Sequence, residues 1–234
     1  MQVRVGSVRG RAVVAVTLAA LLGGCAGSAD GAGENASGGS PSASSGAGGK
    51  GTAAASGGSI GAAGSDCALP VRFDIARHWK AEAIDARTEL SKASKGSGGD
   101  LSGALADAVL RQGPVTAACE IDAKPAGHIG FLRGWTGKPQ HTDAGGVLRQ
   151  FVAAEGDAGK ERYRSVTTGG GLRGVEAEYL YTSKLLGETK AETALAVSTP
   201  DGPVVLHLGG MDTEEHDAMR PAYALAEQTL ALRQ

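Results

Sequence analysis

The sequence predicts an α+β domain with an antiparallel β-sheet, placed after a disordered linker. Four segments of its second half have the apolar alternation of strands and follow one another with short connections: 163–168, 174–184, 189–198 and 203–208. Thr199-Pro200-Asp201-Gly202 is a typical turn sequence between the last two. Other segments carry apolar residues at helical spacing. A run of strands with helices packed on a face indicates this fold class.

The first half of the domain is expected to contribute shorter strands. Their apolar and polar side chains alternate, as in half-buried strands, at 71–75, 80–84, 115–121 and 128–135. His78-Trp79 marks a bend between the first two of these strands. Residues 94–100 are rich in Gly and Ser and predict a loop.

Three helices are expected, each with a recognisable start. Asp100 can cap a helix over 101–111, and Asp143 can cap one that runs to Ala154. The acidic residues 212–215 suit a helix N-terminus, and Pro221 is expected to begin the main helical run. The residues expected to face the core are Leu101, Leu105, Ala108, Val109, Val147, Leu148, Phe151, Val152, Ala222, Leu225, Ala226 and Leu230.

Residues 1–24 have the three parts of a lipoprotein signal peptide. Three arginines form a positive start, and an apolar run of about eleven residues follows, too short for a membrane-spanning helix of ~20. Leu22-Gly23-Gly24-Cys25 matches the lipobox, whose cysteine becomes a thioether to diacylglycerol. We expect cleavage before Cys25, lipidation of Cys25, and a location on the outer face of the cell membrane. The alternative is an ordinary secretory signal with a chance cysteine.

Residues 25–65 are expected to be a disordered tether, and 66–234 the globular domain. The tether is almost wholly Gly, Ala and Ser, which cannot bury enough apolar surface to offset the entropy of ordering. Residues 57–61 within it spell G-x-S-x-G, the hydrolase nucleophile pattern. That pattern has meaning only on a turn between a strand and a helix, so we interpret it as chance.

Charge argues against nucleic acid as a partner. Without the three arginines of the leader, 20 basic residues face 25 acidic ones, a net charge of about −5. Binding to nucleic acid needs a basic stripe that releases counterions, and the sequence has none.

Cys67 and Cys119 remain once Cys25 is assigned to the lipid. An even pair in an oxidising compartment predicts one disulfide. The alternatives are two buried free thiols or a metal pair, although a metal would need more ligands nearby than this spacing offers.

The remaining motifs predict neither a metal nor a cofactor. The histidines are His78, His128, His141, His207 and His216, and no pair has the spacing of a zinc protease. His207 alternates with leucines and is expected on the solvent face of a strand, and His216 in the capping turn of a helix. Residues 169–174 satisfy G-x-G-x-x-G, but a strand follows them instead of the helix that a dinucleotide site requires. We interpret them as a mobile hairpin loop.

Glu176 and Glu178 are expected on one strand face, about 7 Å apart, near the separation of glycosidase carboxylates. Such pairs normally come from different strands across a cleft. A solvated sheet edge facing Lys184 or Lys190 is the simpler interpretation. No nucleophile and base can be paired, so no catalytic residue is predicted.

The domain resembles the PsbP-like superfamily, and within it the LpqN-type lipoproteins of actinobacteria. The likeness rests on the strand that enters the His78-Trp79 bend, the run of antiparallel strands, and the closing segment DTEEHDAMRPAYALAEQTLAL. Arg77 departs from the family, which often has a proline two residues before the tryptophan. The resemblance implies a sheet sandwiched by helices, an α-β-α arrangement, and a binding or assembly role without a shared catalytic apparatus.

Two functions follow. The leading hypothesis is a membrane-anchored surface lipoprotein that is not an enzyme and binds an envelope protein or an amphiphilic ligand. If a groove exists, Trp79, Arg133 and Trp135 are the ligand-binding candidates. The alternative is a cell-envelope hydrolase or transferase, with acidic residues such as Glu176 brought to a cleft by the fold.

Overall fold

The computed structural model of the protein describes residues 52–86, 88, 91, 104, 107 and 109–233. The expected signal peptide, Cys25 and most of the expected tether lie outside the described residues. So do the loop predicted at 94–100 and most of the helix predicted at 101–111. Val109, expected on the core face of that helix, is 55% exposed, so that assignment was wrong.

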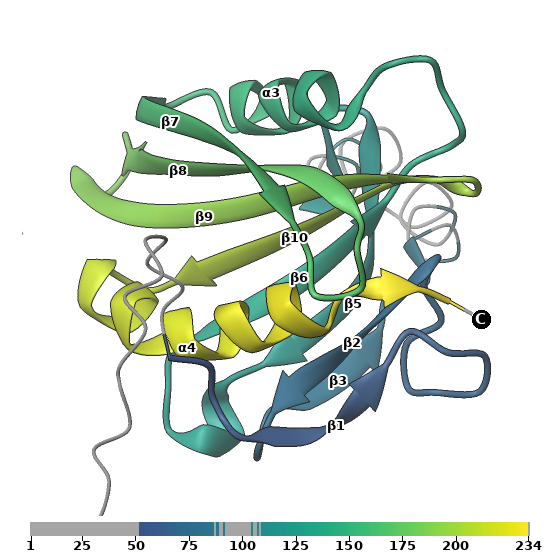
Figure 1. Ribbon diagram of the computed structural model, residues 1–234. Helices are drawn as coiled ribbons and strands as arrows, with labels where there is room; N and C mark the ends of the chain where they lie inside the picture. The colour runs from purple at the N-terminus through teal and green to yellow at the C-terminus, as the bar shows by residue number, and fades with distance from the viewer. Residues whose placement is uncertain are drawn as a thin grey trace, which may run out of the picture. The chain divides into compact units, whose positions relative to one another are not determined.

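The largest unit of the described chain is an eight-stranded antiparallel sheet in the order β3-β5-β6-β10-β9-β8-β7, with β4 paired to β5 (Figure 1). Its strands are β3 (Lys80–Ala83), β4 (Arg111–Gln112), β5 (Val115–Asp122), β6 (Gly130–Thr136), β7 (Ala158–Thr167), β8 (Arg173–Ser183), β9 (Glu188–Thr199) and β10 (Gly202–Gly210). The predicted run of strands in the second half is therefore confirmed. All nine residues of the central strand β10 are buried, because both faces of the sheet are covered there.

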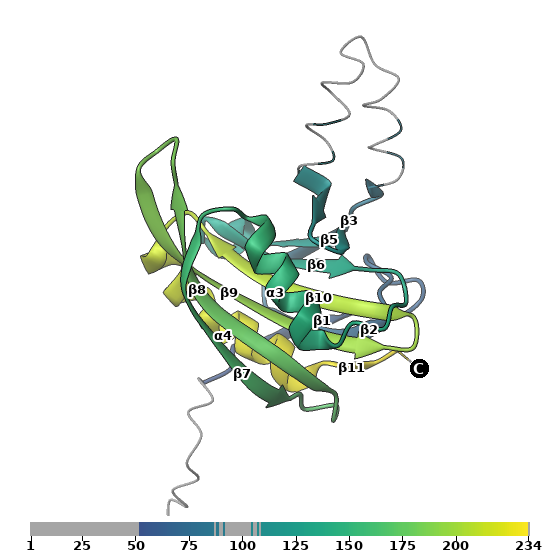
Figure 2. The same cartoon turned by 90° about the horizontal axis from the view of Figure 1, so that it is seen from above.

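Two helices cover opposite faces of this sheet. Helix α3 (Ala144–Ala154) lies on one face, and α4 (Thr213–Thr229) lies on the other with a small second sheet (Figures 1 and 2). Each layer has its own core. Phe151 of α3 meets Trp135 of β6 on one side, and Tyr223 and Leu225 of α4 belong to the core on the other. Among the described residues the fold is thus mostly β. A short 3-10 helix, η1 (Lys124–Ala126), lies between β5 and β6.

The small sheet corrects the expected start of the folded domain. Its order is β1-β2-β11, with β1 at Ser56–Ile60, β2 at Val71–Ala76 and β11 at Ala231–Leu232. β1 was expected in the tether, yet it pairs with β2 along its length and buries Ile60. Small residues permit this: a Cβ on Gly61 would lie 1.9 Å from the Val71 carbonyl oxygen. Composition alone therefore misjudged a segment whose lack of side chains allows close backbone packing. The G-x-S-x-G pattern lies on this strand and not on a strand-to-helix turn.

Helix α4 begins earlier than expected. Pro221 was predicted to start the main helical run, but it lies inside a helix that begins at Thr213. The Asp212 side chain caps this helix by accepting from the Glu215 amide at 2.9 Å. An interior proline costs one helical hydrogen bond. Burial of Met219, Ala222 and other residues on either side of Pro221 offsets that loss.

A disulfide joins the two sheets, as predicted. Cys67 lies in the connection between β1 and β2, and Cys119 lies on β5. Their Cα atoms are 5.7 Å apart, and both residues are fully buried. The bond closes a loop of 52 residues and ties the small sheet to the large one.

Candidate functional site

Helix α3 covers only part of its face of the large sheet. Its N-terminus is set by Asp143, whose carboxylate accepts from the Gly146 amide at 2.6 Å, and its C-cap is Glu155. Beyond Glu155 the same face continues over β8, β9, β10 and β6, where the inward positions become polar. A buried charge network lies against the C-terminal end of α3, where it contacts Phe151 and Glu155, and a groove lies beside it.

His207 on β10 is the centre of the network and was predicted wrongly. It was expected on a solvent face, but it is only 5% exposed. Its Nε2 atom lies 2.8 Å from Glu192 Oε2 on β9 and 3.3 Å from the Tyr179 hydroxyl on β8. The aromatic ring of Phe151 packs edge-on against the imidazole, with ring centroids 5.4 Å apart. The reason for the error is α3, which covers a strand face that the local alternation had left open.

Two carboxylates, those of Glu192 and Glu155, approach His207, and their pKa values are shifted in opposite directions. Burial penalises the charge of Glu192, but His207 and Lys190 outweigh that effect and lower its pKa. The Lys190 ammonium lies 2.8 Å from the other Glu192 oxygen. For Glu155, burial dominates and raises its pKa, although His207 acts in the opposite direction. One buried Glu155 oxygen, Oε2, has no hydrogen-bond partner. Burial also raises the pKa of Tyr179. The network thus holds Glu192 ionised and disfavours the charge of Glu155.

A groove of about 390 Å³ adjoins the network. It is separated from His207 by Phe131, whose ring meets the imidazole edge-on with centroids 6.3 Å apart. Ile129 and Met211 are 50% and 56% exposed, which is unusual for large apolar side chains. The amide of Met211 donates to the carbonyl of Ile129 at 2.9 Å, so the two lie side by side. The groove is lined by Glu120, Asp122, Lys124, Ile129, Gly130, Phe131, Gly210 and Met211.

None of the three predicted ligand-binding residues lines this groove, although Arg133 contacts two residues that do. Its guanidinium pairs with Glu120 and lies 4.5 Å from the centre of the Phe131 ring. Trp135 lies under the same guanidinium at 5.5 Å, but it is 2% exposed and belongs to the core beneath α3. Trp79 is buried in the core on the opposite side of the sheet. The structure therefore does not bring the three together.

Glu176 and Glu178 share one face, as expected, but they are not a solvated edge. They face α4, and Glu176 is 1% exposed. Arg164 binds one Glu176 oxygen at 2.7 Å, and the Tyr223 hydroxyl donates to the other at 3.1 Å. Burial raises the pKa of Glu176, although Arg164 opposes the rise. Together with Glu227, Glu176 lines a cavity of about 250 Å³ beside α4. Glu176 was predicted to be solvated, and that prediction failed because the helix that covers it, α4, lies about 40 residues later in the sequence, so the local pattern cannot indicate it.

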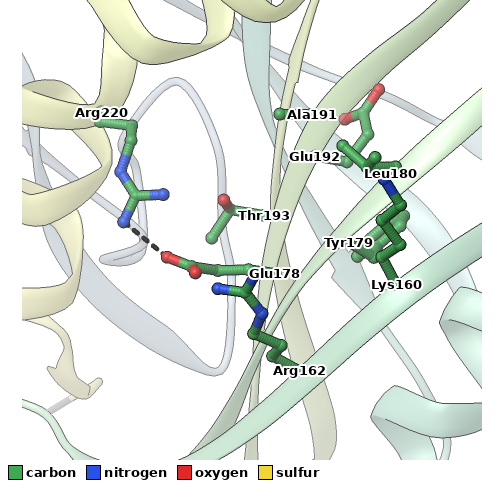
Figure 3. Close-up of a pocket in the computed structure, with 9 residues that line it drawn as sticks. All are labelled: Lys160, Arg162, Glu178, Tyr179, Leu180, Ala191, Glu192, Thr193 and Arg220. Atoms are coloured by element: carbon green, nitrogen blue, oxygen red, sulfur yellow. Dashed lines mark hydrogen bonds and ion pairs between the residues drawn. The ribbon is translucent and has the colours of Figure 1, made fainter.

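A further pocket of about 310 Å³ lies where a bulge separates β7 from β8. Figure 3 shows its side chains in two groups. Glu178 points toward Arg220, with Arg162 beside it, whereas Glu192, Tyr179 and Lys160 form another group. Glu178 faces α4 and Glu192 faces the α3 side, so this pocket does not bring the two carboxylates together.

The glycine-rich segment 169–174 connects β7 and β8 as a hairpin, as predicted, but it is packed and not free. The amides of Gly169 and Gly170 donate to the carbonyls of Glu227 and Leu230 at the end of α4. A Cβ on Gly169 would lie 1.6 Å from a backbone oxygen of α4. These glycines serve close packing between a hairpin and a helix end.

The other histidines do not gather. His216 lies in the first turns of α4 and is buried on the inner face of the helix, with its Nε2 3.0 Å from the Thr193 hydroxyl. His128 lies 3.3 Å from Glu215. Across the described residues, no group of three or more His, Cys, Asp or Glu side chains could hold a metal ion. In the same part of the chain, no helix is long and apolar enough to cross a membrane.

Residues 37–230 match a protein family described as uncharacterised lipoprotein. The chain belongs to this lipoprotein family. The match spans most of the protein, including the whole large sheet, α4, and the small sheet except β11. No curated protein and no solved structure matches the lipoprotein. Its candidate site therefore rests on its own geometry.

Sequence reasoning missed Phe131, Tyr179, Glu155 and Glu192. One signal was available for their common partner. His207 is the only ionisable side chain in the apolar strand Gly202–Gly210, and a strand apolar at nearly every position is expected to be buried on both faces. A histidine within such a strand must find a buried partner.

Proposed function

We propose that this lipoprotein is anchored by lipid on Cys25 to the outer face of the cell membrane and that its domain is a non-catalytic binding module. The groove of Ile129, Phe131 and Met211 is the proposed binding site. Its volume of about 390 Å³ is in the range of ligand sites. The observation that carries the proposal is the exposure of two large apolar side chains above an aromatic floor held by Arg133.

The lining indicates the chemistry of the ligand. Ile129, Phe131 and Met211 line it together with two carboxylates, those of Glu120 and Asp122, and with Lys124. Such a surface suits an amphiphilic partner with apolar side chains and a positive charge, and we propose a segment of an envelope protein. The buried network behind Phe131 supports this role by making the floor rigid, since His207 and Glu192 are each held by more than one contact.

The likeness to PsbP-like domains and to LpqN-type lipoproteins of actinobacteria remains part of this proposal. Helices on opposite faces of one antiparallel sheet support it. An experimental structure that superimposes on a PsbP-like domain with the same strand order would test it, and a different strand order would contradict it.

Photo-crosslinking in living cells tests the binding site. A photoreactive residue at Met211 is expected to form one discrete adduct with an envelope protein, and the same residue at the exposed Gln150 on α3 is the control. Ile129→Asp should abolish the adduct at Met211 without changing protein level. Equal adducts at both sites, or none at Met211, would contradict the proposal. The anchor is tested separately, because Cys25→Ser should move the protein from the membrane to the soluble fraction.

A second candidate function rests on a different cavity. Glu176 and Glu227 line one cavity near Arg164, and the raised pKa of Glu176 suits a general acid of a cell-envelope hydrolase or transferase. The non-catalytic proposal is preferred because each glutamate oxygen of Glu176 already has a protein partner. Turnover of purified cell-wall material that Glu176→Gln abolishes, with unchanged thermal stability, would favour the enzyme.

A further inference from the structure

The connection between β8 and β9 presents two leucines to solvent. Leu185 is 93% exposed and Leu186 is 68% exposed, more than any other large apolar side chain among the described residues. They lie at the end of a hairpin built from two long strands, of 11 and 12 residues. Figure 2 shows this hairpin projecting beyond the layers formed by the sheet and its helices. Two adjacent exposed leucines at a projecting end indicate a surface that meets an apolar environment.

The turn that carries these leucines is well formed. The amide of Leu186 donates to the Ser183 hydroxyl at 3.2 Å, and the amide of Gly187 donates to the Ser183 carbonyl at 2.7 Å. The Lys184 ammonium binds Asp157 at 2.5 Å and stays 81% exposed. These contacts direct the backbone polar groups inward and leave the apolar side chains at the apex.

We propose that Leu185 and Leu186 insert into the interface of the bilayer that carries the lipid anchor. This inference rests on the anchoring at Cys25 proposed above. Apolar side chains at the apex with a lysine beside them are the composition of an interfacial contact, where leucines enter the acyl region and the ammonium stays at the headgroups.

The length of chain before the domain favours the bilayer as the occupant. Thr52, the first described residue, follows Cys25 by 27 positions. A Gly/Ser-rich stretch of that length has a root-mean-square span of about 30 Å. A domain of this size has a radius of gyration of about 16 Å. The root-mean-square distance between the domain and the membrane is therefore about one domain diameter. At that distance the effective concentration of lipid near a projecting hairpin is high.

A fluorescent label at the hairpin end tests the insertion in the acylated full-length protein. With Cys25 acylated and Cys67 bound to Cys119, Leu185→Cys supplies a single free thiol for an environment-sensitive dye. The matched control is Asp201→Cys, which is exposed at the opposite end of β9, about 40 Å away along the strand. Both proteins are reconstituted in vesicles of phosphatidylglycerol and phosphatidylcholine, some containing spin-labelled lipid.

The label at position 185 is expected to shift to the blue in vesicles and to be quenched by the spin-labelled lipid, while the label at 201 does neither. In a chain carrying Cys25→Ser, which lacks the lipid, Leu185→Ser with Leu186→Ser should lower partition into the same vesicles about tenfold. Flotation of the acylated protein with an unshifted label at 185 overturns the insertion alone. An acylated protein that does not float contradicts the anchoring as well. A blue shift that depends on protein concentration and not on lipid overturns the proposal in favour of contact between two copies.

Discussion

Glu155 and Glu192 approach the same histidine, and replacing either by glutamine is expected to change stability in opposite directions. Glu192 lies 2.8 Å from His207 and is paired with Lys190 as well, whereas Glu155 lies 4.0 Å from His207 and keeps an unpartnered oxygen. Glu192→Gln leaves the buried His207 and the partly exposed Lys190 without their carboxylate partner. Glu155→Gln removes a charge that the site disfavours.

The sign of each stability change follows from the direction in which the pKa of the carboxylate is shifted. The pKa of Glu155 is raised above 4.5, mainly by burial, so its favourable contribution to folding exists below pH 4.5 and is lost as the pH rises through the raised value. At pH 7 its charge therefore destabilises the protein. The pKa of Glu192 is lowered despite burial, because His207 and Lys190 favour its charge. Its contribution exists above pH 4.5 and is lost as the pH falls through the lowered value.

The size of each change in the free energy of unfolding follows from the groups that remain buried in the variant. Glu155→Gln keeps a polar group at this buried position but removes its disfavoured charge. Since a buried charge costs more than a buried amide, the change should raise the free energy of unfolding at pH 7 by about 1 kcal/mol. Breaking a buried ion pair costs about 3–5 kcal/mol. Because glutamine still accepts hydrogen bonds, Glu192→Gln should lower the free energy by about 2–3 kcal/mol.

Urea unfolding of both variants at pH 7 and pH 4 measures these effects, and the melting temperature should move by about 2–4 °C per kcal/mol. The gain from Glu155→Gln should vanish at pH 4, and the loss from Glu192→Gln should shrink as the pH falls below 4.5. If both variants lost stability equally at pH 7, the assignment of opposite roles to the two carboxylates would be refuted.

Three further changes probe the fold by urea unfolding. Replacing Cys67 and Cys119 by alanine opens a loop of 52 residues and should cost about 4 kcal/mol; a loss below about 1 kcal/mol would contradict the cross-link. Gly169→Ala places a Cβ 1.6 Å from a carbonyl oxygen of α4 and should cost about 2 kcal/mol or more. Gly159→Ala, where no atom lies within 4 Å, should change stability by under about 0.5 kcal/mol; equal effects would show that the hairpin does not pack on α4. Phe151→Ala empties the centre of the α3 core and should cost about 3–5 kcal/mol, and a loss below about 1 kcal/mol would contradict that packing.

The strands were the most predictable part of the fold. Four strands of the second half occur where the alternation placed them, because short connections keep neighbours in sequence adjacent in space. The start of the domain was not predictable in the same way. β1 consists of small residues, so its hydrogen bonds to β2, and not its side chains, keep it in place.

The candidate site was much less predictable. Arg133 lies next to residues that line the groove, whereas Trp135 beside it belongs to the core. Glu176 and His207 were both placed in solvent because each alternates with apolar neighbours. Alternation distinguishes the two faces of a strand, but it does not tell whether a helix from elsewhere covers the second face.

The amino-acid sequence by itself determined local features of this protein: the cysteine pair, the helix cap at Asp143 and the strand pattern. It also predicts the lipid anchor at Cys25, which stays a prediction. These depend on residues close together in the chain or on residue type alone. The tertiary structure decided which charges are buried, because α3 and α4 cover opposite faces of one sheet. It also created the groove, since Phe131 and Met211 come from separate segments that meet only where β6 pairs with the end of β10. Local features depend on residues that are neighbours in the sequence, whereas burial depends on contacts between distant segments.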